Sequence, residues 1–479
     1  MTQIDRRSFL RNSVLLAGGA AVMSPVAQLL QLHASGASAA GAPAQGGAAG
    51  YGPLSPKAPV FAGPGADPNV QWLSLPEGFD YSIFGVDGIP MSDGNVTPFA
   101  HDGMGAYPAG QGKVRLVRNH EVRDNAGVVA PPSPTNVYDP KAGGGNTTVE
   151  IEFDQGVPKV GRDFVSLSGT HTNCAGGVTP WGSWITCEET TVGAASSFGQ
   201  EHGYAFDIPS SANGPVAPMP LKALGRFDHE AVCVDPRTGI VYETEDNGDS
   251  GFFRFVPRRY GDLSAGKLQM LKVVGVTNYD TRTGQEENKP LQVEWVDIDQ
   301  PDPPGGGSKT VYNEGFGKGG AIFRRLEGCW FQDDSVGGSV FFNSTDGGDA
   351  HHGQVWEFRP QGSQGGKLQL VFEAPDSDTL SFPDNLNVTP RGGVILCEDT
   401  SRPPIALPFS EQYLKGLDRK GRIFDFALNI VDNKEWAGAC WSPDGRYLFV
   451  NTQGKTRTTD PHAPSRTYAI WGPWHRGPL

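Results

Sequence analysis

The stretch "SVFFNSTDGG", residues 339–348, passes from an apolar strand pattern into polar side chains. Its first four residues are typical of a buried β-strand. In contrast, Asn343, Thr345 and Asp346 carry oxygen atoms of the kind that bind metal ions. The preceding segment, "LEGCWFQDDSVGG" (326–338), contains a second short strand and a turn rich in Asp and Gly. Together the two segments predict a β-hairpin that ends in potential metal ligands.

The same strand–turn–strand pattern occurs five more times, at irregular spacings. Six similar β units predict a six-bladed β-propeller with variable insertions between blades. An ordinary β-sandwich with several hairpins is the alternative. The segments "YSIFGVDG" (81–88) and "TYAIWGPW" (467–474) are expected to close the ring. The second strands of the other five units are "VRLVRNHE" (114–121), "WITCEET" (184–190), "IVYETEDN" (240–247), "GVILCEDT" (393–400) and "YLFVNTQG" (447–454).

Composition agrees with an all-β chain. There are 65 Gly and 39 Pro among 479 residues and only 19% charged residues, which favours many tight turns over long helices. The formal net charge is −14. An acidic chain of this kind argues against nucleic acid as a partner and suits cations.

The N-terminus, "DRRSFLRNSVLLAGGAAV", carries a twin arginine before a mildly apolar stretch. This pattern predicts a twin-arginine export signal, and Ala37-Ser38-Ala39 has the small-x-small form of a cleavage site. We therefore expect a signal peptide at 1–39, a flexible lead-in at 40–70 and a single propeller domain at 71–479. The twin-arginine translocase would carry the folded chain to the periplasm or the exterior. No later apolar run is long enough for stable membrane insertion, and we expect a monomer.

Cys174 differs from the other five cysteines. Those five lie in or beside strand-like runs, where a thiol packs as a small apolar group. Cys174 lies in the turn-rich "GTHTNCAGGVTPWG" (169–182), where packing gives no reason for a thiol. It is therefore a candidate ligand.

Hairpin geometry predicts that the candidate ligands meet. The residue that enters the first strand and the residue that leaves the second lie at the same end, opposite the turn. So many carboxylates in one confined mouth repel one another unless cations neutralise them. Oxygen ligands favour Ca²⁺, and a thiolate among them favours a transition metal such as iron. The entering residues are Asp102, Cys174, Glu230, Glu327, Asp384 and Glu435; the leaving residues are Glu121, Glu188, Glu189, Glu245, Asp246, Asp346, Glu398 and Asp399.

Several motifs resemble those of the PhoX-type alkaline phosphatases, which are exported bacterial propeller enzymes that hold iron and calcium in one site. The motifs are "RNHE" (118–121), "NCAGGVTPWGSWITCEE" (173–189), "GRFDHEAV" (225–232), "RRLEG" (324–328) and "WAGACWSPDGRYLFVN" (436–451). The resemblance runs through nearly the whole mature chain. Because the chain lacks the long insertions of larger members, it resembles a shorter subgroup.

The resemblance implies hydrolysis of phosphate monoesters at an Fe³⁺/Ca²⁺ cluster. It makes Cys174 and Glu327 iron ligands with a part in catalysis, Arg325 the clamp for the phosphate, and Glu230 a further metal ligand. The remaining metal ligands, not assigned to one metal or the other, are Glu121, Glu188, Glu245, Asp246 and Glu398.

Two alternatives remain open at this point. A calcium-dependent propeller that hydrolyses lactones or phosphotriesters needs acids at the mouth but neither Cys174 nor Arg325. A non-catalytic, calcium-stabilised propeller that binds a partner needs no dense charged channel.

Overall fold

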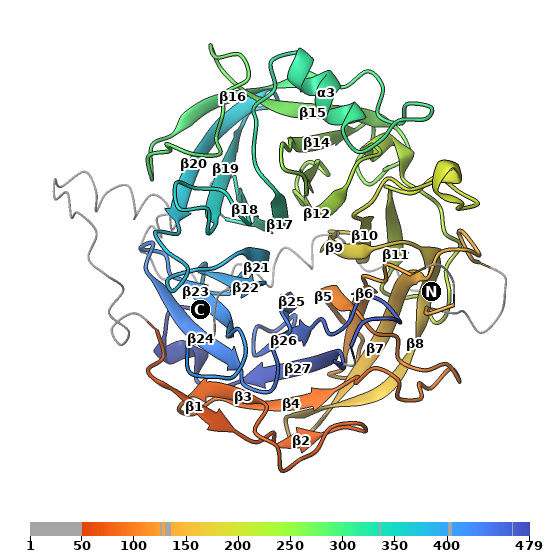
Figure 1. Ribbon diagram of the computed structural model, residues 1–479, viewed down its shortest axis with the longest axis vertical. Helices are drawn as coiled ribbons and strands as arrows, with labels where there is room; N and C mark the ends of the chain where they lie inside the picture. Colours follow the sequence, from red (N-terminus) through yellow and green to blue (C-terminus); the bar gives the residue numbers. More distant parts are fainter. Residues whose placement is uncertain (1–49, 125–126, 130–135, 335–336, 401–404, 462) are drawn as a thin grey trace, which may run out of the picture. The chain divides into compact units, whose positions relative to one another are not determined.

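Six antiparallel hairpins surround the centre of the structure, in the order that the sequence predicts (Figure 1). The computed structural model describes residues 50–479 except 125–126, 130–135, 335–336, 401–404 and 462, so the expected signal peptide at 1–39 lies outside the described residues. The hairpins are β5 (His101–Pro108) with β6 (Val114–His120), β9 (Asn173–Val178) with β10 (Ser183–Glu188), β12 (His229–Val234) with β13 (Val241–Glu245), β17 (Leu326–Gln332) with β18 (Ser339–Ser344), β21 (Pro383–Val388) with β22 (Val394–Glu398), and β25 (Trp436–Trp441) with β26 (Tyr447–Thr452).

Each hairpin is extended outward into a blade. Because β16 pairs with both β15 and β20, the third and fourth blades form one continuous sheet. The added strands are β7 (Gly144–Asp154) and β8 (Val157–Thr170) in the first blade, β11 (Ala205–Pro209) in the second, β14 (Phe252–Pro257), β15 (Gly266–Val273) and β16 (Leu291–Asp297) in the third, β19 (Gln354–Gln361) and β20 (Gly365–Glu373) in the fourth, β23 (Gln412–Leu417) and β24 (Ile423–Asn429) in the fifth, and β27 (Arg466–Trp471) in the sixth.

The two ends of the described chain close the ring. Strand β4 (Asp80–Phe84) pairs antiparallel with β27, and β3 (Leu73–Pro76) pairs with β24. The innermost strands pack in the cyclic order β5, β9, β12, β17, β21, β25 and back to β5. The prediction of a six-bladed propeller closed by these segments is therefore confirmed.

The lead-in contributes more than its composition indicates. Strand β1 (Leu54–Lys57) pairs with β3, and β2 (Phe61–Ala62) pairs with β4, so both cover the outer edges of the closing blades. Tyr51 packs edge-on against Phe79, with ring centroids 4.9 Å apart. These contacts give the segment a place in the fold despite its many small residues.

Apolar side chains fill the spaces between blades. Phe252 of the third blade stacks on Phe342 of the fourth, with ring centroids 4.2 Å apart, and both are fully buried. Burial of one such ring contributes roughly 2 kcal/mol. The apolar face of "SVFFNS" thus joins neighbouring blades, which leaves the polar strand end free to serve the mouth.

Helix α3 (Thr310–Gly317) lies outside β15 (Figure 1). Among the described residues, no helix has both the length and the apolar character needed to span a membrane.

Candidate metal centre

One position at the start of each innermost strand faces the mouth of the ring. In five blades it is the second residue of the strand, and in the sixth it directly precedes β25. The side chains at these positions in the first four blades are buried. The six residues are Asp102, Cys174, Glu230, Glu327, Asp384 and Glu435.

A local irregularity sets the direction of these side chains. The register of each inner hairpin shifts at its mouth end, as between His229 and Val232 in the third blade and between Leu326 and Cys329 in the fourth. Such β-bulges turn a side chain away from its regular direction and are common beside active sites. Because Glu230 and Glu327 lie within these shifts, the bulges help to position both carboxylates.

Glycine follows two of the acids for a steric reason. A Cβ on Gly328 would lie 2.4 Å from the backbone nitrogen of Leu386, and one on Gly103 would lie 2.6 Å from Cα of Ala175. The contacts belong to the innermost strands of the next blades. Only glycine therefore allows these strands to approach closely enough to bring their acids together.

A second set of side chains comes from the residues that directly follow the second strands. These side chains lie close to the first set, because their charges raise the pKa values of its members. The carboxylate of Asp399 raises the pKa of Glu435, and that of Asp246 raises the pKa of Glu327. The fourth blade has Thr345 at this position and the sixth has Gln453, whose Nε2 donates to Glu121 at 2.5 Å and to Asp102 at 3.2 Å. The acidic members of this set are Glu121, Glu189, Asp246 and Asp399.

Three acids singled out from the sequence lie elsewhere. Glu188, Glu245 and Glu398 are the last residues of β10, β13 and β22, one position before the acids at the mouth. Successive side chains of a strand point to opposite faces, so the structure does not bring these three carboxylates into the cluster. They accept backbone N–H groups instead: Glu188 from His171 at 2.9 Å, Glu245 from Gly251 at 2.8 Å and Glu398 from Ser381 at 2.9 Å. Asp346, which follows Thr345, forms an ion pair with Arg324 at 2.9 Å.

Two groups of donor atoms are close enough to share a metal ion. The first joins Cys174, Glu189 and Glu230, and the second joins Glu230, Glu327 and Asp384; within each group the ligand atoms lie within 4.8 Å of one another. Glu230 belongs to both, and its Oε1 lies 3.1 Å from Sγ of Cys174. Glu230 could therefore serve as a ligand in either group.

The protonation of the cluster reflects its burial. Burial, followed by the neighbouring carboxylates, raises the pKa of Asp102, Glu230 and Glu327 well above the usual range, and raises that of Asp384 to about 7. Burial and then Asp102 and Glu230 raise the pKa of the Cys174 thiol. Bound cations reverse these shifts, because they favour the charged forms of their ligands.

Two arginines border the acids. Arg325 donates from Nε and Nη2 to Asp246 at 3.0 and 2.9 Å, and from Nη2 to Glu327 at 3.1 Å. Arg123 forms ion pairs with Glu121 and, at 3.0 Å, with Glu189. Both side chains are about two-fifths exposed, Arg325 at 41% and Arg123 at 40%, so both guanidinium groups reach the opening.

Arg123 was not predicted from the sequence. A usable signal was its position two residues after Glu121, since Arg325 likewise lies two residues from Glu327. The sequence placed Cys174 in a turn-rich stretch, at the residue that enters the first strand of a hairpin; in the structure it is the second residue of β9 and is 6% exposed. Buried inside a strand, the thiol is fixed in position beside Glu230.

The donor set suits metal ions. Asp102 Oδ1 and Glu230 Oε2 are buried and have no hydrogen-bond partner in the described part of the chain. Buried polar atoms without partners are costly, and here they lie among further carboxylates. Oxygen donors match Ca²⁺, and the thiol beside Glu189 and Glu230 matches a transition metal.

Fold and site together define a propeller whose mouth carries arginines beside acidic groups that could hold metal ions. Within that class, the chain belongs to the alkaline phosphatase PhoX family, whose sequence model matches residues 50–455. The family makes the chain a phosphoester hydrolase. No curated protein sequence matches the chain.

One solved structure shares the fold of the chain. The structure of Pseudomonas fluorescens PhoX in complex with vanadate, described as a transition state analogue, is 17% identical, with a TM-score of 0.63 over 85% of this chain and 97% of that chain. A glucose dehydrogenase is 11% identical, with a TM-score of 0.35 over 63% of this chain and 82% of that one. A putative 6-phosphogluconolactonase from Bacteroides uniformis is also 11% identical, with a TM-score of 0.34 over 75% and 81%. The last two similarities are too weak to support an argument.

Proposed function

We propose that the chain hydrolyses phosphate monoesters at an Fe³⁺/Ca²⁺ cluster held in the mouth of the propeller. The observation that carries this proposal is the position of Arg325, whose guanidinium is fixed beside Glu327 and Asp246 at the rim of the acid cluster. Phosphate esters are anions, so an acidic mouth binds them only where bound cations and fixed arginines outweigh the carboxylates.

Cys174, Glu189 and Glu230 are the proposed ligands of iron, because this group alone offers a thiol. Glu230, Glu327 and Asp384 are the proposed ligands of the neighbouring ion, with Glu230 bridging. The resemblance to the family assigns Glu327 to iron, whereas in the structure Glu327 is grouped with Glu230 and Asp384 and not with Cys174. Of the remaining acids, we propose Glu121, Asp246 and Asp399 as ligands or supports, and we propose no ligand role for Glu188, Glu245 and Glu398.

The metals, when bound, would neutralise charge on the phosphoryl oxygens and lower the pKa of a water molecule. The chain itself contributes binding and orientation. Arg325 has an Nη1 group with no hydrogen-bond partner among the described residues, and it can donate to a phosphoryl oxygen while Nε and Nη2 stay on their carboxylates. Arg123 offers a second positive charge across the mouth.

We also propose that the protein works outside the cytoplasm, exported by the twin-arginine translocase and acting as a monomer on small phosphate esters. This follows from the N-terminal pattern at residues 5–11. Neither nucleic acid nor a membrane is proposed as a partner.

Metal analysis combined with p-nitrophenyl phosphate hydrolysis tests the proposal. The purified protein is expected to contain both iron and calcium and to hydrolyse the ester. Calcium without iron, together with hydrolysis of a lactone or a phosphotriester, would favour the lactonase alternative. Calcium without hydrolysis of any of these substrates would favour the binding propeller.

A further inference from the structure

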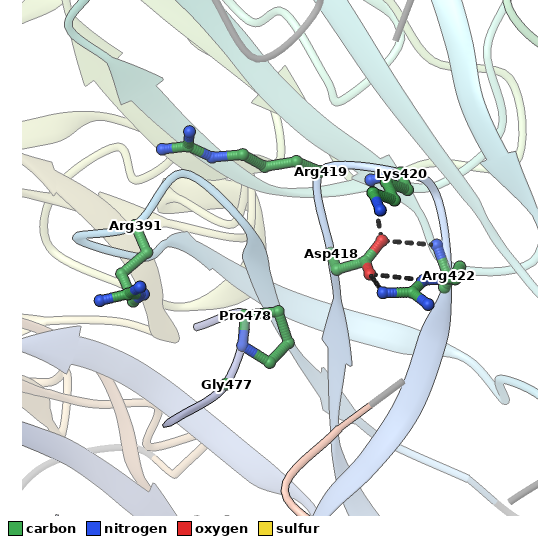
Figure 2. A pocket seen from close by; sticks show the side chains of 7 residues that line it. All are labelled: Arg391, Asp418, Arg419, Lys420, Arg422, Gly477 and Pro478. Carbon is green, nitrogen blue, oxygen red and sulfur yellow. Dashed lines mark hydrogen bonds and ion pairs between the residues drawn. The ribbon is translucent and has the colours of Figure 1, made fainter. Parts of the chain in front are cut away.

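Two adjoining pockets lie on the face of the propeller opposite the metal centre, between the fifth and sixth blades. The first, of about 470 Å³, is lined by the β21–β22 and β23–β24 turns and by Gly477 and Pro478 (Figure 2). The second, of about 530 Å³, is lined by the β21–β22 and β25–β26 turns and by the segment after β27. Arg391 lines both pockets. The β21–β22 and β25–β26 turns lie at the opposite ends of their strands from Asp384, Asp399 and Glu435, so the pockets and the mouth are separate regions.

The first pocket is strongly basic although the chain is acidic. Arg391, Arg419, Lys420 and Arg422 line it, with Asp418 as its single carboxylate. Asp418 is already occupied: it accepts the backbone N–H of Lys420 at 2.8 Å and Nε of Arg422 at 2.7 Å. Arg391, Arg419 and Lys420 form no ion pair with any described carboxylate. The pocket therefore has an excess of positive charge that the protein itself does not neutralise.

Arg419 is held in place rather than free in solvent. A Cβ on Gly392 would lie 2.7 Å from Nη2 and 2.8 Å from Nε of Arg419, so the guanidinium lies against the turn where glycine leaves room for it. Its Nε is buried and has no hydrogen-bond partner among the described residues. Burial and the nearby charge of Arg391 lower the pKa of Arg419. An anion between the two guanidinium groups would reduce the repulsion between them.

The second pocket is aromatic. Trp441, Tyr447, Trp471 and Trp474 line it together with Arg391. Trp474 donates from Nε1 to the carbonyl of Arg446 at 2.8 Å, but Nε1 of Trp441 is buried without a partner in the described structure. Aromatic side chains provide flat apolar surface, and an indole N–H inside a pocket is normally paired. The pocket thus offers a flat apolar surface for a ring.

We propose that this face binds a small ligand that carries a phosphate-type oxyanion on a ring, with the oxyanion between Arg391 and Arg419 and the ring against Trp441 and Trp471. The site is independent of the proposed metal chemistry, since it shares no residue with the mouth. Arg391 stands where the two pockets meet, which places the charged group and the ring of one ligand side by side.

Phenylphosphonate is a suitable probe, because a phosphatase cannot hydrolyse its C–P bond. Calorimetric titration of the metal-loaded protein is expected to show a binding site that Arg391→Gln with Arg419→Gln weakens by about 10-fold or more, as for loss of charge-assisted hydrogen bonds. Hydrolysis of p-nitrophenyl phosphate by the same variant is expected to stay within about two-fold of wild type. The matched control is Arg258→Gln with Arg259→Gln, which removes the same charge from an exposed turn of the third blade.

Methylphosphonate, which has no ring, tests the proposed contact between the ring of the ligand and Trp441 and Trp471. This site should prefer phenylphosphonate, and Trp441→Ala should remove the preference while binding of methylphosphonate stays unchanged. The proposal is overturned if the Arg391/Arg419 variant binds phenylphosphonate as wild type does, if the control variant loses the site equally, or if the wild type does not distinguish the two phosphonates at this site.

Discussion

Nη2 of Arg325 lies 3.1 Å from Oε1 of Glu327, two residues further along the chain, and the same guanidinium also contacts Asp246. Arg325 adopts a positive φ of 42° just before β17. Its N–H donates to the carbonyl of Asn247 at 2.8 Å, and its carbonyl accepts from Thr345 at 2.9 Å. Unfavourable backbone conformations persist where the surroundings hold them and are frequent at functional sites. The arginine is therefore oriented before any substrate arrives.

Replacing Arg325 by Ala should lower kcat/KM for p-nitrophenyl phosphate by about 100- to 1000-fold, the range seen when a donor to a developing negative charge is removed. The control is Arg324→Ala, because Arg324 is adjacent and pairs with Asp346 instead of the cluster. Its activity should stay near wild type. Equal losses in the two variants would show that the effect is structural.

Replacement of Glu188 or Glu189 by Gln should affect different properties of the protein. Glu189→Gln is expected to lower metal content and activity but to leave the stability of the metal-free protein nearly unchanged, because its carboxylate lies in the group with Cys174 and Glu230. Glu188→Gln is expected to retain metal but to lose roughly 1 to 3 kcal/mol of stability, since its oxygens accept from the N–H groups of His171 and Gly203 and the new amide would oppose one of these donors. Metal analysis and thermal unfolding measure both. Loss of metal from the Glu188 variant alone would reverse our assignment.

Glu188 and Glu189 also show which features could be predicted from the sequence and which could not. Alternation of apolar residues, the turns and the common strand ends were enough to predict six hairpins and the segments that close the ring. The choice between adjacent acids was not predictable, because it depends on the residue at which each strand ends and on the bulges at the mouth. A shift of one position reverses the direction of a side chain.

Contacts between distant segments were equally hidden. The pairing of β16 with both β15 and β20 joins two blades, and Arg123 contacts Glu189, which lies 66 residues away. Neither contact leaves a recognisable pattern in the sequence around the residues involved. The lead-in shows the same limit, since strands β1 and β2 exist through pairing with β3 and β4 and not through their own composition.

Removal of metal should destabilise the fold. Ions that bind only the native state add about 2.7 kcal/mol when their concentration is 100 times Kd, and without them the buried carboxylates at the mouth must take up protons or repel one another. Treatment with a chelator is therefore expected to lower Tm and abolish hydrolysis together, and both should return when calcium and iron are restored. Unchanged Tm and full activity after complete removal of metal would contradict the proposed centre.

Export should depend on the arginine pair. Arg6→Lys with Arg7→Lys keeps the charge but removes the paired guanidinium groups that the translocase recognises, so the protein should remain in the cytoplasm. The matched control is Arg11→Lys, outside the pair, which should be exported normally. Cell fractionation and immunoblotting measure the distribution, and periplasmic accumulation of the double variant would exclude this route.

Cys174 provides the most selective test of the metal assignment. A thiolate bound to ferric iron donates charge to the metal and gives a coloured protein, whereas calcium sites are colourless. Cys174→Ser keeps the size of the side chain but removes the soft ligand, so it should abolish the visible absorption band and lower activity by orders of magnitude. The fold should survive, because all six cysteines are free and no disulfide is lost.

The matched control is Cys233→Ser. Cys233 is also buried, but its Sγ accepts from Cys329 at 3.3 Å, away from the mouth, so this variant should keep its colour and activity and lose about 1 to 3 kcal/mol of stability. Iron-containing wild-type protein without colour, or a coloured and active Cys174 variant, would show that this thiol does not bind iron and would favour the calcium-dependent lactonase.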